Sequence, residues 1–283
     1  VSSVDYSADV PIGAGILRQL ADVYRKVRNT SRYLLGHLHD FNPAADTVPV
    51  AELPLLDRWM LQRTAEVMDE ISEAFENYEF FRFFQLLQNF CVTDLSNFYL
   101  DIAKDRLYVS APSDQRRRSC QTVMSLIIER LAGLIAPVLC HMAEDIWQNL
   151  PYEVEEISIF HRGWPTVPPD WRDPSLSEPI QRLRELRAAV NRVLEDCRSR
   201  QELGASLEAA VRIETRNQEL ESALNWLNES GDTETDGLRD WLLVSQLQLG
   251  GEPWAELLAN QTNDSAIIEV SRARGIKCER CWH

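Results

Sequence analysis

Apolar residues recur at every third or fourth position through the first 150 residues of the chain, which is the spacing of amphipathic helices. This spacing predicts four long helices, over 17–38, 54–78, 80–107 and 119–150. Gly133 and Pro137 interrupt the fourth, which we expect to be kinked or split. Four such helices joined by short loops predict an antiparallel bundle over residues 16 to about 152.

The helix predicted over 17–38 has two distinct faces. At 100° per residue its apolar and small residues share one face, which consists of Leu17, Leu20, Tyr24, Val27, Ser31, Leu34 and Leu38. A second stripe, roughly 120° away by the same arithmetic, consists of Arg18, Arg25, Arg28, Asn29 and Arg32. We therefore expect this helix to pack on one side and to present cations on the other.

Aromatic and aliphatic side chains also recur at helical spacing over 80–107. The stripe consists of Phe80, Phe83, Phe84, Leu87, Cys91, Leu95, Phe98 and Ile102. It fits either the core of a helix bundle or a surface that stacks on nucleic-acid bases. Stacking platforms usually display their rings from strands, so we prefer the core interpretation.

The composition changes over 161–179, where five prolines indicate a connector: Pro165, Pro168, Pro169, Pro174 and Pro179. A further helix is predicted over 178–202 and another near 218–227. Strands are predicted over 209–214, 242–249 and 266–271.

These elements predict a mainly α fold class, an antiparallel helix bundle followed by a small α+β domain that ends in half a zinc knuckle. The expected domain ranges are 1–160 for the bundle, 161–179 for the connector, 180–274 for the α+β domain and 275–283 for the truncated zinc motif.

The distribution of charge along the chain sets the first predicted helix apart from the rest. The chain has 283 residues and a net charge of −15, which speaks against adhesion of the whole surface to nucleic acid. The first helix reverses that sign, with several Lys and Arg residues against the single acid Asp22, and this indicates an anionic partner. The second helix is rich in acids between Asp57 and Glu79. An acidic helical scaffold for protein partners is therefore the alternative function.

The last residues, KCERCWH, contain Cys278 and Cys281 with two residues between them. This spacing suits two thiolate ligands of tetrahedral zinc, although a structural site needs four ligands. A redox pair and unused cysteines are the alternatives. His283 is not a usual third ligand in this arrangement, so the sequence predicts half of a zinc site.

Two more groups are candidates for RNA contact. Arg280 and Trp282 flank the cysteine motif, where Trp282 either stacks on an unpaired base or caps the knuckle. The run Arg116–Arg118 is either a phosphate contact or a solvated charge run.

The sequence also limits the class of protein. It contains no GxxxxGK, GxGxxG, GxSxG or HExxH motif, so no catalysis is expected from this chain alone. Its longest apolar run, Leu131–Cys140, is about half of what a membrane-spanning helix needs. Scattered cysteines and the lack of a leader predict a soluble, cytoplasmic location. The start at Val1 and the end inside a motif suggest a fragment of a longer protein.

Five segments carry a family resemblance. They are Tyr24–Thr30 with Arg32 and Tyr33, Leu95–Asp101 with Lys104–Tyr108, Ala136–Pro137 with Ala143–Trp147, Leu203–Ala209, and Gly275–Trp282. The first three resemble the anticodon-binding bundle of class I aminoacyl-tRNA synthetases. The last two narrow the resemblance to bacterial-type isoleucyl-tRNA synthetases, and fit the valyl and leucyl enzymes poorly. Met142 stands where that family commonly has Thr, which we interpret as a difference in packing.

The resemblance implies a function for the cationic helix. It would lie along the anticodon stem-loop of isoleucine-accepting tRNA, with arginines on phosphates and with Asn29 and Tyr33 near bases. Tyr33 alternatively only borders the core. The RNA-binding residues expected on this basis are Arg18, Arg25, Arg28, Asn29, Arg32, Tyr33, Arg280 and Trp282.

The resemblance also implies what belongs to the rest of the enzyme. The HIGH and KMSKS signatures of the catalytic domain, which uses ATP and Mg, are absent here, as is the editing domain. A second pair of cysteines beyond His283 would complete the zinc site. The implied partners are the tRNA and the catalytic domain of the same polypeptide, in a monomeric enzyme.

Overall fold

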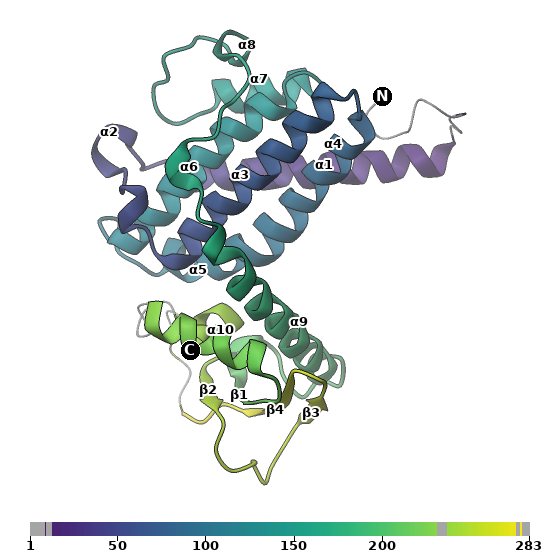
Figure 1. The fold of residues 1–283 in the computed structure, drawn as a ribbon, viewed down its shortest axis with the longest axis vertical. Helices are drawn as coiled ribbons and strands as arrows, with labels where there is room; N and C mark the ends of the chain where they lie inside the picture. Colours follow the sequence, from purple (N-terminus) through teal and green to yellow (C-terminus); the bar gives the residue numbers. More distant parts are fainter. Residues whose placement is uncertain (1–8, 10–12, 231–236, 276–277, 279–283) are drawn as a thin grey trace. The chain divides into compact units, whose positions relative to one another are not determined.

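The computed structural model describes residues 9, 13–230, 237–275 and 278. The chain divides into two compact units, Val1–Asp173 and Pro174–His283 (Figure 1). Helices dominate the first unit, and the second combines helices with a small sheet.

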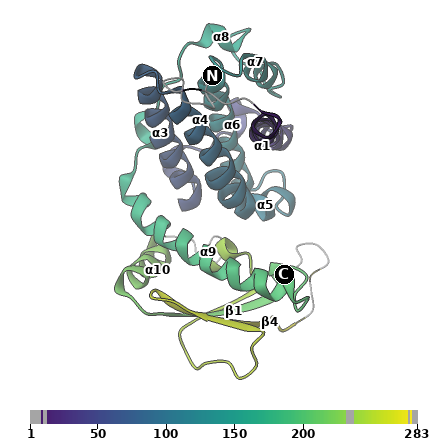
Figure 2. The ribbon, with the colours of Figure 1, turned by 90° about the vertical axis from the view of Figure 1, so that its right-hand side faces the viewer.

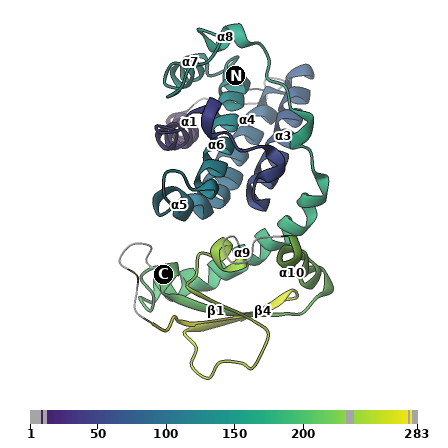
Figure 3. The same cartoon turned by 90° about the vertical axis from the view of Figure 1, so that its left-hand side faces the viewer.

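The first unit is a helix bundle. Its helices are α1 Ala14–His37, α2 Pro43–Asp46, α3 Leu55–Glu76, α4 Phe80–Asn89, α5 Leu100–Tyr108, α6 Gln115–Ile135, α7 Cys140–Gln148 and α8 Ile159–Arg162. The π-helix η2 Phe90–Tyr99 joins α4 to α5, and the 3-10 turns η1 Val50–Glu52 and η3 Pro169–Trp171 lie in connections. In Figures 2 and 3, α1 and α3 lie on opposite sides of this bundle.

The bundle core consists of the predicted apolar stripes. The stripe of the third predicted helix runs through α4, η2 and α5, and Phe83, Cys91 and Leu95 on it are fully buried. This confirms the core interpretation. The fourth predicted helix is split as expected, since α6 ends at Ile135 and α7 begins at Cys140. Gly133 packs closely against the connector, since a Cβ there would lie 3.2 Å from the Pro165 ring.

The apolar face predicted for the first helix is only half correct. Val27, Leu34 and Leu38 are buried in the bundle. Leu17 and Tyr24 are 58% and 45% exposed, because the N-terminal turns of α1 extend beyond the neighbouring helices (Figure 1). Helical spacing identifies a face, but it does not show how much of that face has a partner.

A buried ion pair joins α3 to α5 inside the bundle. The Arg106 guanidinium donates to the Asp57 carboxylate at 2.8 Å, and the Tyr99 hydroxyl donates to the same carboxylate at 2.5 Å. Asp57 and Arg106 are 0% and 2% exposed. Burial, followed by the nearby Asp57, raises the pKa of Tyr99, and burial raises the pKa of Cys120 to about 12.

The second unit contains a four-stranded sheet in the order β2-β1-β4-β3. Its elements are η4 Pro174–Leu176, α9 Ser177–Ser199, η5 Ser206–Glu208, β1 Ala209–Thr215, α10 Gln218–Ser230, α11 Leu238–Leu242, β2 Gln246–Leu249, β3 Ala259–Thr262 and β4 Ala266–Arg272. β1 pairs with β2 in parallel and with β4 in antiparallel orientation, and β3 pairs with β4 in antiparallel orientation. Helices α9 and α10 cover the same face of the sheet (Figures 2 and 3).

Two strand predictions need correction in this unit. The strand expected over 242–249 is present only as β2 Gln246–Leu249, because the preceding residues form α11 and Leu243 then takes a left-handed backbone with φ 55°. The strand β3 was not predicted. Its sequence, ANQT, has a single β-branched residue, Thr262, and no aromatic one, which is too weak a strand pattern to detect, and it pairs with β4.

Candidate nucleic-acid interface

The side of α1 that faces away from the bundle is cationic. Arg18, Arg25, Arg28, Asn29 and Arg32 are all exposed in the structure, and we call these residues the α1 ridge. Arg25 lies 3.2 Å from the exposed Asp22, and the Arg18 side chain donates to the Ala14 carbonyl at 3.2 Å. Within the described residues, Arg28 and Arg32 have no ion pair. The ridge therefore presents guanidinium groups that remain available for an anion.

The opposite side of α1 is held by small polar residues as well as by apolar ones. The Thr30 hydroxyl lies 3.0 Å from the Ser96 hydroxyl of η2, and Ser31 donates to the Val27 carbonyl at 3.0 Å. Small side chains at these positions allow η2 to approach α1 closely. Because this contact fixes the rotation of α1, the ridge is directed outward.

Tyr33 lies at the border between the core and the surface. Its ring centroid is 4.2 Å from that of His37, and the His37 centroid is 5.1 Å from that of Tyr108 on α5. Burial, followed by proximity to Tyr108, raises the pKa of Tyr33, so its phenol stays protonated. Tyr108 is 64% exposed. The sequence did not identify His37 and Tyr108 as candidates, although Tyr108 ends one of the family-like segments.

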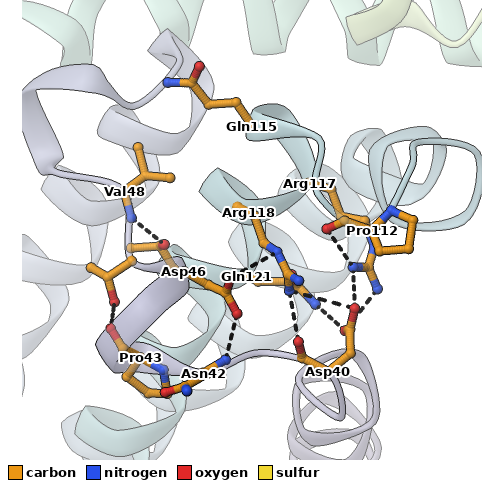
Figure 4. A network of polar contacts seen from close by, with 12 residues as sticks. Asp40, Asn42, Pro43, Asp46, Val48, Pro112, Gln115, Arg117, Arg118 and Gln121 are labelled. Atoms are coloured by element: carbon orange, nitrogen blue, oxygen red, sulfur yellow. Dashed lines mark hydrogen bonds and ion pairs between the residues drawn. The ribbon is translucent and has the colours of Figure 1, made fainter.

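The arginine run at the start of α6 has a structural function that the sequence did not indicate. Arg117 is buried and donates two hydrogen bonds to Asp40, at 2.6 and 2.9 Å (Figure 4). Arg118 donates to the Asp40 carbonyl at 2.9 Å, and Gln121 donates to the Asp40 carboxylate at 2.8 Å. These two arginines are therefore neither phosphate contacts nor a solvated charge run. They fix the loop after α1 to α6.

This network makes the stability of the first unit depend on pH. The hydrogen bond from Arg117 holds the pKa of Asp40 well below its usual range. Asp40 therefore contributes stability above an unfolded-state pKa of about 3.9, and this contribution is lost as the pH falls below that value. We expect Asp40→Asn to lower the melting temperature at pH 7, and the difference from the wild type to narrow below about pH 4.

Thermal unfolding at a series of pH values measures this difference. Glu155→Gln, at an exposed position, is the control and should melt like the wild type throughout. A gap between Asp40→Asn and the wild type that stays constant down to pH 3 would refute the assigned role of this carboxylate.

The acids of α3 are largely neutralised inside the unit, which weighs against a protein-docking scaffold. Arg63 pairs with Glu66 and Glu70, and Arg172 pairs with Asp69. Arg82 pairs with Glu73 and with Glu79, which lies just after α3. The exposed negative field of this helix is therefore weaker than its sequence indicates.

The predicted zinc motif is described only at Cys278, which is exposed. Cys281, Arg280 and Trp282 lie outside the described residues. In the described part of the chain, no group of three or more His, Cys, Asp or Glu residues is placed to hold a metal ion. The same part contains no helix that is long and apolar enough to cross a membrane.

Comparison with known proteins defines the class of this helix-bundle protein. Residues 57–213 match the family model of the anticodon-binding domain of tRNA ligase. Because the match covers more than half of the chain, the chain belongs to this family. The matched region begins in α3, so α1 and its ridge lie before it.

Individual relatives are similar to this chain over its whole length. It is 83% identical over 283 residues to an isoleucine–tRNA ligase of Parasynechococcus marenigrum (strain WH8102) and 77% identical to one of Prochlorococcus marinus (strain MIT 9313). An isoleucine–tRNA ligase of Prochlorococcus marinus subsp. pastoris is 56% identical over the same length. The chain spans 29% of the length of each of these relatives.

Proposed function

We propose that this chain recognises the anticodon stem-loop of isoleucine-accepting tRNA, as the anticodon-binding part of an isoleucine–tRNA ligase. The observation that carries the proposal is the exposed α1 ridge on an otherwise acidic member of the anticodon-binding family. The attachment of isoleucine, with its requirement for ATP and Mg, belongs to the catalytic part of the same polypeptide. The enzyme is proposed to be monomeric and cytoplasmic.

Different residues on this side of α1 suit the phosphates and the bases of an RNA loop. Guanidinium groups bind phosphate oxygens and set the position of the RNA, but carry little sequence information. Asn29 is exposed and presents both an acceptor and donors, so its side chain suits the edge of an unpaired loop base. The Tyr33 hydroxyl is buried, which favours the alternative that Tyr33 only borders the core. Binding here contributes energy far from the reacting atoms, and this energy positions the acceptor end for catalysis.

The C-terminal motif is proposed as one half of a zinc site. Cys278 is exposed and has a side chain suited to zinc. Among the described residues, no group of three or more possible ligands is placed to hold a metal ion, so we propose that Cys281 and two ligands from outside this chain complete the site. Arg280 and Trp282 would then lie beside the metal and contact the same RNA loop.

Directed cleavage tests the proposed function. An iron chelate is tethered to the variant Asp22→Cys, whose new cysteine lies on the ridge side of α1. Cys140, Cys278 and Cys281 are replaced by serine so that the chelate attaches only at position 22. The remaining cysteines are buried. When this labelled protein is bound to an isoleucine-accepting tRNA transcript, the chelate should cleave the anticodon arm and leave the acceptor stem intact.

The matched control carries the chelate at Asp170→Cys. This exposed residue belongs to η3, which packs against α3 on the other side of the bundle from α1 (Figure 2). Little cleavage is expected from it. Cleavage of the acceptor stem from position 22, or equal patterns from both positions, would contradict the proposed function.

A further inference from the structure

Gly36 lacks a structural explanation in the last turn of α1. Glycine is the least favourable residue in a helix after proline. The backbone of Gly36 does not take the left-handed conformation that favours glycine, and a Cβ added there would meet no atom within 4 Å. Neither strain nor packing within the described residues therefore requires glycine. A glycine at an open position leaves room for the close approach of a ligand backbone.

Gly36 lies between the α1 ridge and a group of three rings. At 100° per residue it is about 40° from Arg32 and about 60° from Tyr33 around the helix axis. Tyr33 contacts His37, which contacts Tyr108. An open strip of backbone therefore separates a guanidinium group from an exposed aromatic ring.

The surroundings of Tyr108 are suited to a nucleotide. The residue is 64% exposed, which leaves much of its side chain for a partner. His37 supports it in an edge-on arrangement at 83°, and the His37 ring nitrogen lies 2.9 Å from the Tyr33 carbonyl, which fixes that imidazole. Lys104 lies one helical turn before Tyr108 on the same face of α5 and pairs with Asp101 at 2.7 Å. The face of α5 that carries the ring therefore also carries one cation, which is already paired with an acid.

We propose that Gly36 and Tyr108 form a subsite for one unpaired nucleotide of the bound RNA. The base stacks on Tyr108, the sugar–phosphate backbone passes over Gly36, and Arg32 reaches the adjoining phosphate. This inference rests on the proposed function and adds a specific contact to it. An exposed aromatic ring together with the cations of the α1 ridge suits a nucleotide, because every base has a π-face and every linkage carries a negative charge.

Fluorescence of a modified tRNA tests the subsite. The probe is an isoleucine-accepting transcript that carries 2-aminopurine at each unpaired position of the anticodon loop in turn. With the wild-type chain and with Tyr108→Phe, one position should be quenched on binding, since both keep the ring. Tyr108→Leu should lose this quenching and bind about tenfold more weakly.

Gly36→Ala provides an independent test in which stability and binding change in opposite directions. The added methyl group should raise the melting temperature by about 1–4 °C, because alanine favours the helix. It should also weaken tRNA binding several-fold, because it occupies the path of the backbone. Gly15→Ala is the matched control, since Gly15 lies in the same helix and is equally open. It should raise the melting temperature and leave tRNA binding unchanged.

The outcomes separate this inference from the proposed function. If Tyr108→Leu and Gly36→Ala bind and quench like the wild type, while Arg25→Glu with Arg32→Glu loses binding, the subsite is refuted and the proposed function stands. If the wild-type chain does not bind the tRNA, both are refuted. Any loss of folding in Tyr108→Leu would show in its melting curve. In that case the tRNA affinity of Gly36→Ala would decide whether the subsite exists.

Discussion

Replacing Arg106 by methionine should destabilise the helical unit by about 3–5 kcal/mol, the usual effect of removing one partner from a buried ion pair. Asp57 is fully buried, and Arg106 donates to it at 2.8 Å. Without the guanidinium, the carboxylate keeps hydrogen bonds from two neutral groups, the Tyr99 hydroxyl at 2.5 Å and the Cys120 thiol at 3.8 Å. The remaining negative charge would then be poorly compensated inside the core. Urea denaturation followed by circular dichroism measures the change.

The same helix provides the control. Lys104 of α5 pairs with Asp101 at 2.7 Å, a similar distance, but its side chain is 53% exposed. Lys104→Met should therefore change the free energy of unfolding by less than about 1 kcal/mol. The double variant Asp57→Leu with Arg106→Met should recover much of the loss, because it buries no charge. If Arg106→Met and Lys104→Met unfold at similar urea concentrations, the buried pair of Asp57 and Arg106 does not contribute the stability assigned to it.

Reversing two charges of the α1 ridge should abolish most RNA binding without affecting the fold. Arg25→Glu with Arg32→Glu removes two cations and adds two anions at exposed positions. We expect the affinity for isoleucine-accepting tRNA to fall about 100-fold at low salt. The slope of log K against log salt concentration should become shallower by about 2, one unit for each lost phosphate contact. The melting temperature should stay close to that of the wild type.

A matched variant separates this local effect from a change in net charge. Arg192→Glu with Arg216→Glu alters the net charge of the chain by the same amount, at exposed positions of the second unit. It should retain most of the affinity. Equal losses in the two double variants would show that the RNA responds only to the total charge of the protein.

The sequence predicts the helices of the bundle because their apolar spacing is regular and their core is made by the same residues. The stripe through Phe83, Cys91 and Leu95 is buried as expected. The α1 ridge is exposed for the complementary reason, since residues opposite a buried face must point outward. Patterning within one element thus predicts which side of that element is buried.

What the sequence did not predict are contacts between distant elements. Asp57 and Arg106, like Asp40 and Arg117, are far apart in the chain and meet only after the helices pack. An arginine has the same sequence signature on a solvated face and in a buried pair, so the function of Arg117 was not apparent. The ring group at Tyr108 was missed for the same reason, because His37 and Tyr108 belong to different helices.

The measurement that tests the central claim most directly is a titration of the wild-type chain and the ridge-reversed variant with tRNA at two salt concentrations. Each is titrated with an isoleucine-accepting transcript and with the same transcript carrying a replaced anticodon. We predict that the wild type binds in a salt-dependent way, binds the replaced anticodon more weakly, and loses both properties when Arg25 and Arg32 are reversed. Wild-type binding that ignores both the anticodon and the ridge reversal would contradict the claim that α1 contacts the anticodon stem-loop.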